Sequence, residues 1–197
     1  EAQEGVVVEM LSRCRLPRRA FAEAGKSTVK ARVLITGAVA DAEALSACQV
    51  MQLLVQKALH QETMVVRNAR QAEEALGSAV YLLVLFSKGM LRDPDFADIL
   101  LTVTEGSDGG VEIVTVSADT GFEFPGPDFY KVLELGGLGS PGLGPEVGSR
   151  LSRAYRALLS VLAFPLSPLG SEGLLDKQVS EICRRFRKFT DSLQSLL

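Results

Sequence analysis

The sequence contains a single histidine, His60, and only three cysteines. One histidine excludes a metal site built from several histidines and disfavours a Ser-His-Asp triad. The cysteines, Cys14, Cys48 and Cys183, lie far apart and are odd in number, which argues against a disulfide scaffold and against a zinc site. Unpaired cysteines suit a reducing compartment, so we expect a cytoplasmic protein.

Long apolar runs are also lacking. None approaches the roughly 20 residues that a membrane-spanning helix needs, so we expect no membrane span. The first nine residues are acidic rather than basic, unlike a secretory signal, and the chain begins with Glu1 rather than Met, as a piece of a longer protein would. Apolar residues make up 47% of the 197, which is enough for the core of one domain of ordinary size and excludes global disorder.

Charge is unevenly distributed. Residues 13–32 carry seven basic residues and one acid, whereas residues 33–135 carry fifteen acids and six bases. A second basic run, Arg184–Lys188, lies near the end of the chain. Basic flanks can attract phosphates or an acidic membrane. A simpler explanation is that the basic residues lie on a solvated helix face and in a linker, where they balance the charge of the acidic residues 33–135. We therefore expect no nucleic-acid partner.

Apolar strands alternate with helices in the first two thirds of the chain. The run at 80–86 is apolar on both of its alternating faces, as expected of a central parallel strand that is covered on both sides. Asp41 is placed to cap the helix that follows the first strand. This order predicts an α/β, flavodoxin-like, doubly wound parallel sheet. We expect strands at 31–36, 63–66, 80–86 and 111–116, helices at 41–60, 70–76 and 93–103, and a core that includes Val33, Ile35, Leu83, Leu85, Ile113 and Val114.

The C-terminal third has a different composition. Residues 136–148 are rich in glycine and proline, which predicts a loop, and two amphipathic helices are expected after it, near 148–164 and 171–197. The second helix carries an apolar stripe at spacings of three and four. The stripe consists of Leu175, Val179, Ile182, Phe186, Phe189, Leu193 and Leu196. We expect the two helices to form a hairpin with its turn at 165–170; pairing of the second helix with another chain is the alternative.

These patterns divide the chain into four parts. We expect a basic, partly helical flank at 1–30, a doubly wound domain at 31–135, the loop at 136–148, and a helical extension at 149–197.

Three nucleotide or phosphate motifs fail on inspection. Gly25–Thr28 matches the end of a P-loop, but Ala20 occupies the position of its first glycine and no strand precedes it. A response-regulator receiver needs acids after its first and third strands, where this chain has Thr36-Gly37 and Ser87-Lys88. The glycine-rich turn of a dinucleotide-binding fold is absent after the first strand.

Four patches between residues 31 and 135 follow one another in a recognisable order. They are Val33–Gly37 with Asp41, Ala75–Ser87, Met90-Leu91 with Asp95–Ala97, and Glu112–Val116 with Phe122–Pro127. The order resembles a TIR (Toll/interleukin receptor) domain: an opening strand followed by an Asp, a helix that leads to an apolar strand and a serine, the stretch where a Trp-Cys pair usually follows, and an aromatic-proline segment after the fourth strand. The resemblance implies a flavodoxin-like fold and association with other TIR domains.

Some TIR domains hydrolyse NAD, and the resemblance implies where their catalytic glutamate would lie. It stands four residues beyond a conserved Trp and stabilises the positive charge that develops on the ribose. With Phe96 aligned to that Trp, the position is Leu100, which has no carboxylate. Asp98 is the nearest acid and substitutes only if the alignment slips by two residues; a solvent-facing helix position is its simpler role.

The loop after the second strand is shorter than is usual in TIR domains, which use it for self-association. Here Arg67, Asn68 and Arg70 lead directly into the next helix. The two arginines could contact an acidic partner surface or a phosphate, or could complement Glu73 and Glu74.

The sequence therefore favours a TIR-like protein-interaction module in intracellular signal transduction. We expect it to lack hydrolase activity, cofactor and metal, and to bind other TIR-type domains or itself. Two alternatives stay open: an NAD hydrolase that uses Asp98, and a structural flavodoxin-like domain of a larger protein.

Overall fold

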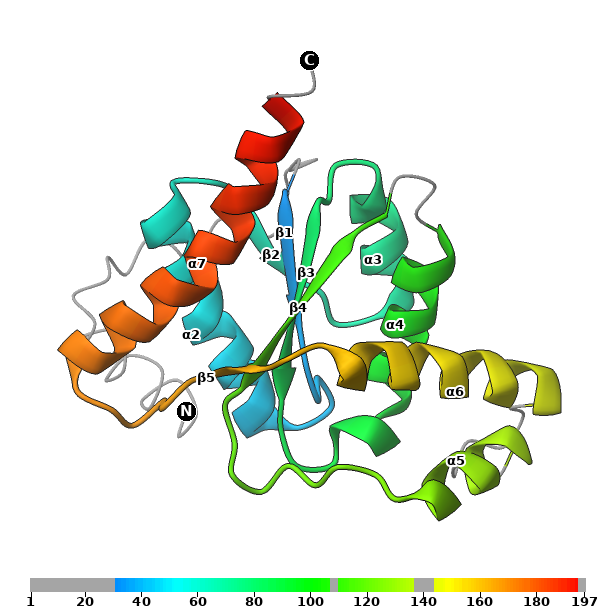
Figure 1. The fold of residues 1–197 in the computed structure, drawn as a ribbon. Coiled ribbons are helices and arrows are strands. Elements are labelled where there is room, and N and C mark those ends of the chain that lie inside the picture. Colours follow the sequence, from blue (N-terminus) through cyan, green and yellow to red (C-terminus); the bar gives the residue numbers. More distant parts are fainter. Residues whose placement is uncertain (1–30, 107–109, 137–143, 195–197) are drawn as a thin grey trace.

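The computed structural model describes residues 31–106, 110–136 and 144–194, with side chains as far as Phe186. Its centre is one sheet of five parallel strands in the order β2-β1-β3-β4-β5. Helices cover both faces of this sheet, so the predicted flavodoxin-like α/β fold is confirmed (Figure 1). The strands are β1 (Val33–Thr36), β2 (Thr63–Val65), β3 (Tyr81–Phe86), β4 (Glu112–Ser117) and β5 (Phe164–Pro165).

The continuous apolar strands occupy the middle of the sheet, as predicted. Every residue of β1 and β3 is buried, because each strand has a neighbour on both sides and helices on both faces. Five of the six predicted core residues are buried, but Ile113 is only partly buried. The reason is the shortness of β5, which pairs only with Val116 and Ser117 and leaves the first half of β4 without a fifth strand beside it.

Two of the helices begin next to a side chain that caps them. Asp41 accepts a 2.8 Å hydrogen bond from the Ala44 N–H at the start of α2, as predicted, and Asn68 accepts one of 3.0 Å from the Gln71 N–H at the start of α3. The helices are α2 (Ala42–Leu59), α3 (Ala69–Leu76), α4 (Pro94–Gly106), α5 (Pro127–Glu134), α6 (Pro145–Ser160) and α7 (Glu172–Gln194), with a 3-10 turn η2 (Met90–Arg92).

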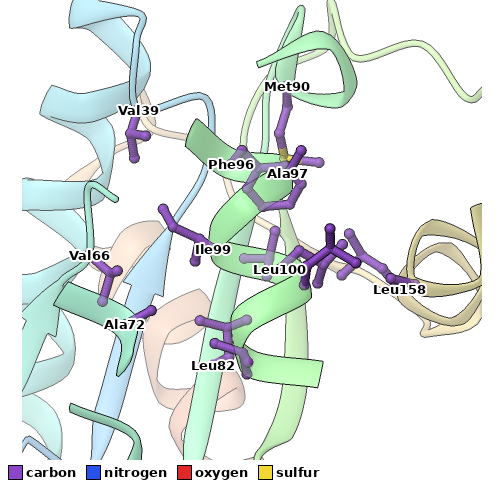
Figure 2. Packing of buried hydrophobic residues seen from close by; sticks show 14 of the residues in the cluster. Val39, Val66, Ala72, Leu82, Met90, Phe96, Ala97, Ile99, Leu100 and Leu158 are labelled. Carbon is purple, nitrogen blue, oxygen red and sulfur yellow. The ribbon is translucent and has the colours of Figure 1, made fainter. Parts of the chain in front are cut away.

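Two separate hydrophobic cores lie on the two faces of the sheet. One core joins the sheet to α3, α4 and α6, and its centre around Phe96, Ile99 and Leu100 is shown in Figure 2. The other joins the sheet to α2 and α7 through residues such as Met51 and Phe186. Helix α5 packs on α6 (Figure 1).

The predicted C-terminal hairpin is wrong. Both C-terminal helices exist, but α6 buries Leu151, Tyr155 and Leu158 in the α4 core, whereas α7 buries Val179 and Ile182 in the α2 core. They therefore lie on opposite faces of the sheet (Figure 1). The chain crosses between the faces at β5, in the segment that the sequence suggested was only a turn. The C-terminal part of the chain completes the sheet and both cores instead of extending from them.

Some predicted features fall outside the described residues. These are the flank at 1–30 with Gly25–Thr28, residues 137–143 of the glycine-rich loop, and the side chains of the stripe beyond Phe186. Helix α6 begins at Pro145, earlier than the sequence suggested. Within the described ranges, no helix combines the length and apolarity needed to cross a membrane.

Candidate functional site

The carboxyl edge of the sheet is the first place to look for a site. In doubly wound folds, ligands bind outside the carboxyl ends of the strands, where the strand order reverses. Here the reversal falls between β1 and β3. The loops that begin at Gly37 and Ser87 leave these strands, and the loops after β2 and β4 flank them.

A buried carboxylate joins the two central loops. Asp93 is 7% exposed, and its Oδ2 accepts a 2.9 Å hydrogen bond from the backbone N–H of Ala40, in the loop after β1. Its Oδ1 accepts from the N–H groups of Asp95 (2.9 Å) and Phe96 (3.2 Å), in the first turn of α4. Both oxygens are thus used to hold the backbone, which leaves Asp93 a structural rather than a catalytic role.

A second carboxylate fastens the loop after β4. Asp119 accepts hydrogen bonds from the backbone N–H groups of Lys88 (2.9 Å) and Gly121 (2.7 Å). These bonds favour the charged form and hold the pKa of Asp119 below its usual value. Phe122 follows and stacks on Phe86 with ring centroids 4.6 Å apart, so this loop covers the end of β3.

The space between β1 and β3 is filled by protein atoms. A Cβ on Gly37 would lie 2.9 Å from the Leu85 carbonyl oxygen and 3.4 Å from the Cys48 sulfur. Burial raises the pKa of Cys48 to about 12, so its thiol stays protonated and unreactive. Thr36 donates its hydroxyl proton to the Val66 carbonyl at 3.2 Å. The edge is therefore closed by its own side chains and backbone at this position.

One buried polar atom at this edge forms no hydrogen bond with the described residues. The hydroxyl of Ser87 is buried and has no hydrogen-bond partner among the described residues. Ser87 directly follows β3 and is the serine on which the TIR resemblance partly rests. With Asp93 and Asp119 both committed to backbone N–H groups, neither provides a free base to activate it.

The residues aligned with a TIR catalytic site lie on different sides of helix α4. Leu100 is fully buried in the α4 core beside Leu158 (Figure 2), whereas Asp98 is exposed on the outside of α4. Phe96, aligned with the family's Trp, is also fully buried, and its ring is parallel to that of Tyr155 with centroids 6.2 Å apart. Burial raises the pKa of Tyr155, and its neutral hydroxyl donates to the Leu91 carbonyl at 3.3 Å.

The loop after β2 is rigidly built and carries exposed arginines. Asn68 caps α3, and the Arg67 N–H donates to the Gln71 side chain at 2.9 Å, so the loop and helix restrain each other reciprocally. Arg70 pairs with Glu74 at 2.8 Å on the surface, which is one of the two roles that the sequence left open for it. The side chains of Arg67 and Arg70 are exposed, as a contact surface requires.

Sequence reasoning missed the structural roles of Asn68 and Asp119, although local signals were present. Asn68 precedes a helix and is followed by Gln71 three residues later, which is the spacing of a capping box. Asp119 stands two residues before Gly121, a spacing typical of an Asx turn. Asp93 was expected only at the start of the helix at 93–103; its bond to Ala40 is a long-range contact that no local pattern encodes.

Within the described part of the chain, no cluster of three or more His, Cys, Asp or Glu side chains is arranged to hold a metal ion. No protein-family model matches this chain, and no curated protein matches it either.

Proposed function

We propose that this chain is a TIR-like protein-interaction module that acts in intracellular signalling by associating with other TIR-type domains or with itself. The strand order, the use of both Asp93 oxygens by backbone N–H groups and the exposed arginines after β2 support this proposal. The fold alone does not select this function, because unrelated activities use the same sheet.

The observation that carries the proposal against the enzyme alternative is the burial of Leu100. A glycosidic carboxylate must lie within contact distance of the sugar. At position 100 it would lie in the apolar core, and Asp98 points to solvent from a different side of α4. No observation of the described residues favours Asp98 as a catalytic acid.

The candidate contact surface combines opposite charges. Arg67 and Arg70 are exposed at the start of α3, while Glu73 on the same helix and Asp95 and Asp98 on the adjacent α4 are exposed acids. A surface that carries both signs can pair with a second copy of itself, because each arginine finds an acid on the partner. Association of this kind weakens as the salt concentration rises.

Sedimentation equilibrium across a concentration series tests this proposal. The wild-type chain should show an average mass that rises with concentration and falls with added salt. The double variant Arg67→Glu/Arg70→Glu should stay at monomer mass. Lys177→Glu is the matched control, since Lys177 is an exposed base on α7, on the other face of the sheet, and its reversal should leave association unchanged. Equal association of all three proteins would contradict the proposed surface.

Incubation with NAD and detection of released nicotinamide tests the alternative. We expect no release above the buffer background. Turnover that disappears in Asp98→Ala would overturn the proposal and make the domain an NAD hydrolase. If the chain neither associates nor hydrolyses NAD, the structural role within a larger protein is favoured.

A further inference from the structure

The first half of strand β4 forms an open edge of the sheet. On the β3 side, the Glu112 N–H donates to the Val80 carbonyl at 2.9 Å. Because successive residues of a strand direct their backbone groups to opposite sides, the N–H and carbonyl of Ile113 point away from β3. Strand β5 does not reach them, since it pairs only with Val116 and Ser117 (Figure 1). Neither group of Ile113 bonds to the backbone of a described residue.

Solvent reaches this part of the edge. Val111, Glu112 and Ile113 are each partly exposed, whereas every residue of the neighbouring strand β3 is buried. An unpaired N–H and carbonyl at an exposed edge are the groups to which a further strand bonds.

The two outer strands of the sheet, in contrast, have blocked edges. At β2, the Thr63 carbonyl accepts a 2.7 Å hydrogen bond from the Gln52 side chain of α2, and the Thr63 hydroxyl donates to the Gln52 carbonyl at 3.3 Å. At β5, the Leu166 N–H donates to the Ser117 carbonyl at 2.9 Å, so the backbone of the preceding Pro165 faces outward. Proline has no N–H to offer a further strand. Among the described edges, the first half of β4 is therefore the one that can accept a strand.

The side chains beside this edge define the chemistry of the strand that fits it. Ile113 packs on the α4 core, whereas Glu112 lies on the α7 side and pairs with Arg185 at 3.0 Å. Arg184 and Arg185 are both exposed. The side chains of an added strand also alternate between the two faces, so every second residue lies beside Ile113 and the residues between lie beside Arg185. Apolar residues fit the first position, and acids fit the second.

We propose that the free edge of β4 binds an extended peptide segment of a partner protein, in which apolar residues alternate with acids. The segment adds to the sheet as a further strand, bonds to the N–H and carbonyl of Ile113, and places an acid beside Arg185. A second copy of β4 matches this edge less well, because its single acid, Glu112, is already paired. The proposal does not depend on the TIR-like function.

Nuclear magnetic resonance of the full chain, titrated with a synthetic peptide, tests this contact. The probe is a short peptide of alternating valine and glutamate with both ends blocked. At saturation, we expect the Ile113 amide signal to shift and its hydrogen exchange to slow roughly tenfold, because a bonded amide must open before it exchanges. The amides of β2, at the opposite edge of the sheet, should stay unchanged.

Matched peptides and variants separate backbone pairing from charge. N-methylation of every amide of the probe should abolish both effects on Ile113. Replacement of its glutamates by lysine should weaken binding roughly fivefold. Arg185→Gln should weaken binding of the glutamate peptide by a similar factor, because glutamine keeps a donor for Glu112 but carries no charge. Lys177→Gln, at an exposed base earlier in α7, is the control and should bind as the wild type does.

Several results would overturn the proposal. An Ile113 amide that the peptide leaves unchanged at millimolar concentration would show that the edge accepts no strand. Equal binding of the N-methylated peptide would exclude backbone pairing, and equal binding of the lysine peptide would exclude an acidic partner. Protection of Ile113 that rises with protein concentration alone would make a second copy the occupant.

Discussion

The two faces of the sheet are covered in different ways. The face of α3, α4 and α6 is closed by stacked rings, with Tyr155 between Phe96 and Phe129, and by a second layer in which α5 packs on α6. Among the described residues, the face of α2 and α7 is covered by one layer of helices. Polar contacts at its amino end accompany the apolar ones, including the ion pair of Arg185 with Glu112.

The C-terminal segment, from α6 to α7, helps to cover both faces of the sheet. It supplies one covering helix to each face, α6 to the first and α7 to the second, and β5 carries the chain between them. The α4 face is covered by helices that are each followed by further strands or helices of the chain. The α7 face depends on a helix that follows every strand in the chain.

We expect the largest loss of stability from a substitution on the α4 face. Tyr155→Ala should lower the free energy of unfolding by about 3–5 kcal/mol, because it empties a fully buried ring site and leaves the Leu91 carbonyl without its hydroxyl donor. Urea denaturation followed by circular dichroism measures the change. Tyr155→Phe keeps the ring and should cost only about 1 kcal/mol. Equal losses for the two variants would mean that the ring packing contributes little.

On the α7 face, Phe186→Ala should cost about 3 kcal/mol, again from a buried ring. We expect its effect to be local, with hydrogen exchange accelerated in α7 much more than in α4, because the buried residues of α7 and α4 belong to different cores. Leu174→Ala, at an exposed position of the same helix, should change stability by less than about 0.5 kcal/mol. Uniform acceleration across both faces would show that the two cores unfold together.

Gly148→Ala tests how much the packing of α5 on α6, the second layer of the α4 face, contributes to stability. A Cβ at this position of α6 would overlap the Leu133 carbonyl of α5, so α5 must shift, at a cost of about 1–3 kcal/mol. Gly173→Ala is the control, because nothing lies within 4 Å of its Cβ position in α7 and alanine favours a helix by up to about 1 kcal/mol. Thermal melts of the two variants should therefore move in opposite directions.

The smallest effect concerns the loop that leads from β4 towards the α5 side. The folded pKa of Asp119 is lowered, so its stabilisation is present above the unfolded pKa of about 3.9 and is lost as the pH falls through the lower folded value. Asp119→Asn should reduce stability at pH 7 by less than about 1 kcal/mol, because the site is near the surface. Melting temperatures measured from pH 7 to pH 2 should converge for the two proteins at the acidic end. A gap that persists at pH 2 would contradict a charge-dependent contribution.

Much of the candidate site could be read from local patterns, and the remainder could not. The helix start at Asp41, the ion pair of Arg70 with Glu74, and the exposed position of Asp98 all follow from spacing along one helix. The bond from Ala40 to Asp93 and the stacking of Phe96 near Tyr155 join segments more than fifty residues apart. Such contacts depend on how the loops meet, which periodicity does not describe.

The sequence by itself determined the parallel sheet and the amphipathic helices, since apolar spacing dictates which side of an element must leave water. It did not determine where α6 and α7 pack. An apolar stripe is satisfied equally by a neighbouring helix or by a sheet, and a two-residue strand such as β5 is too short to show a period. Only the tertiary structure decided that the two helices lie on opposite faces, because β5 pairs with the edge of β4 and the chain passes there from the α4 core to the α2 core.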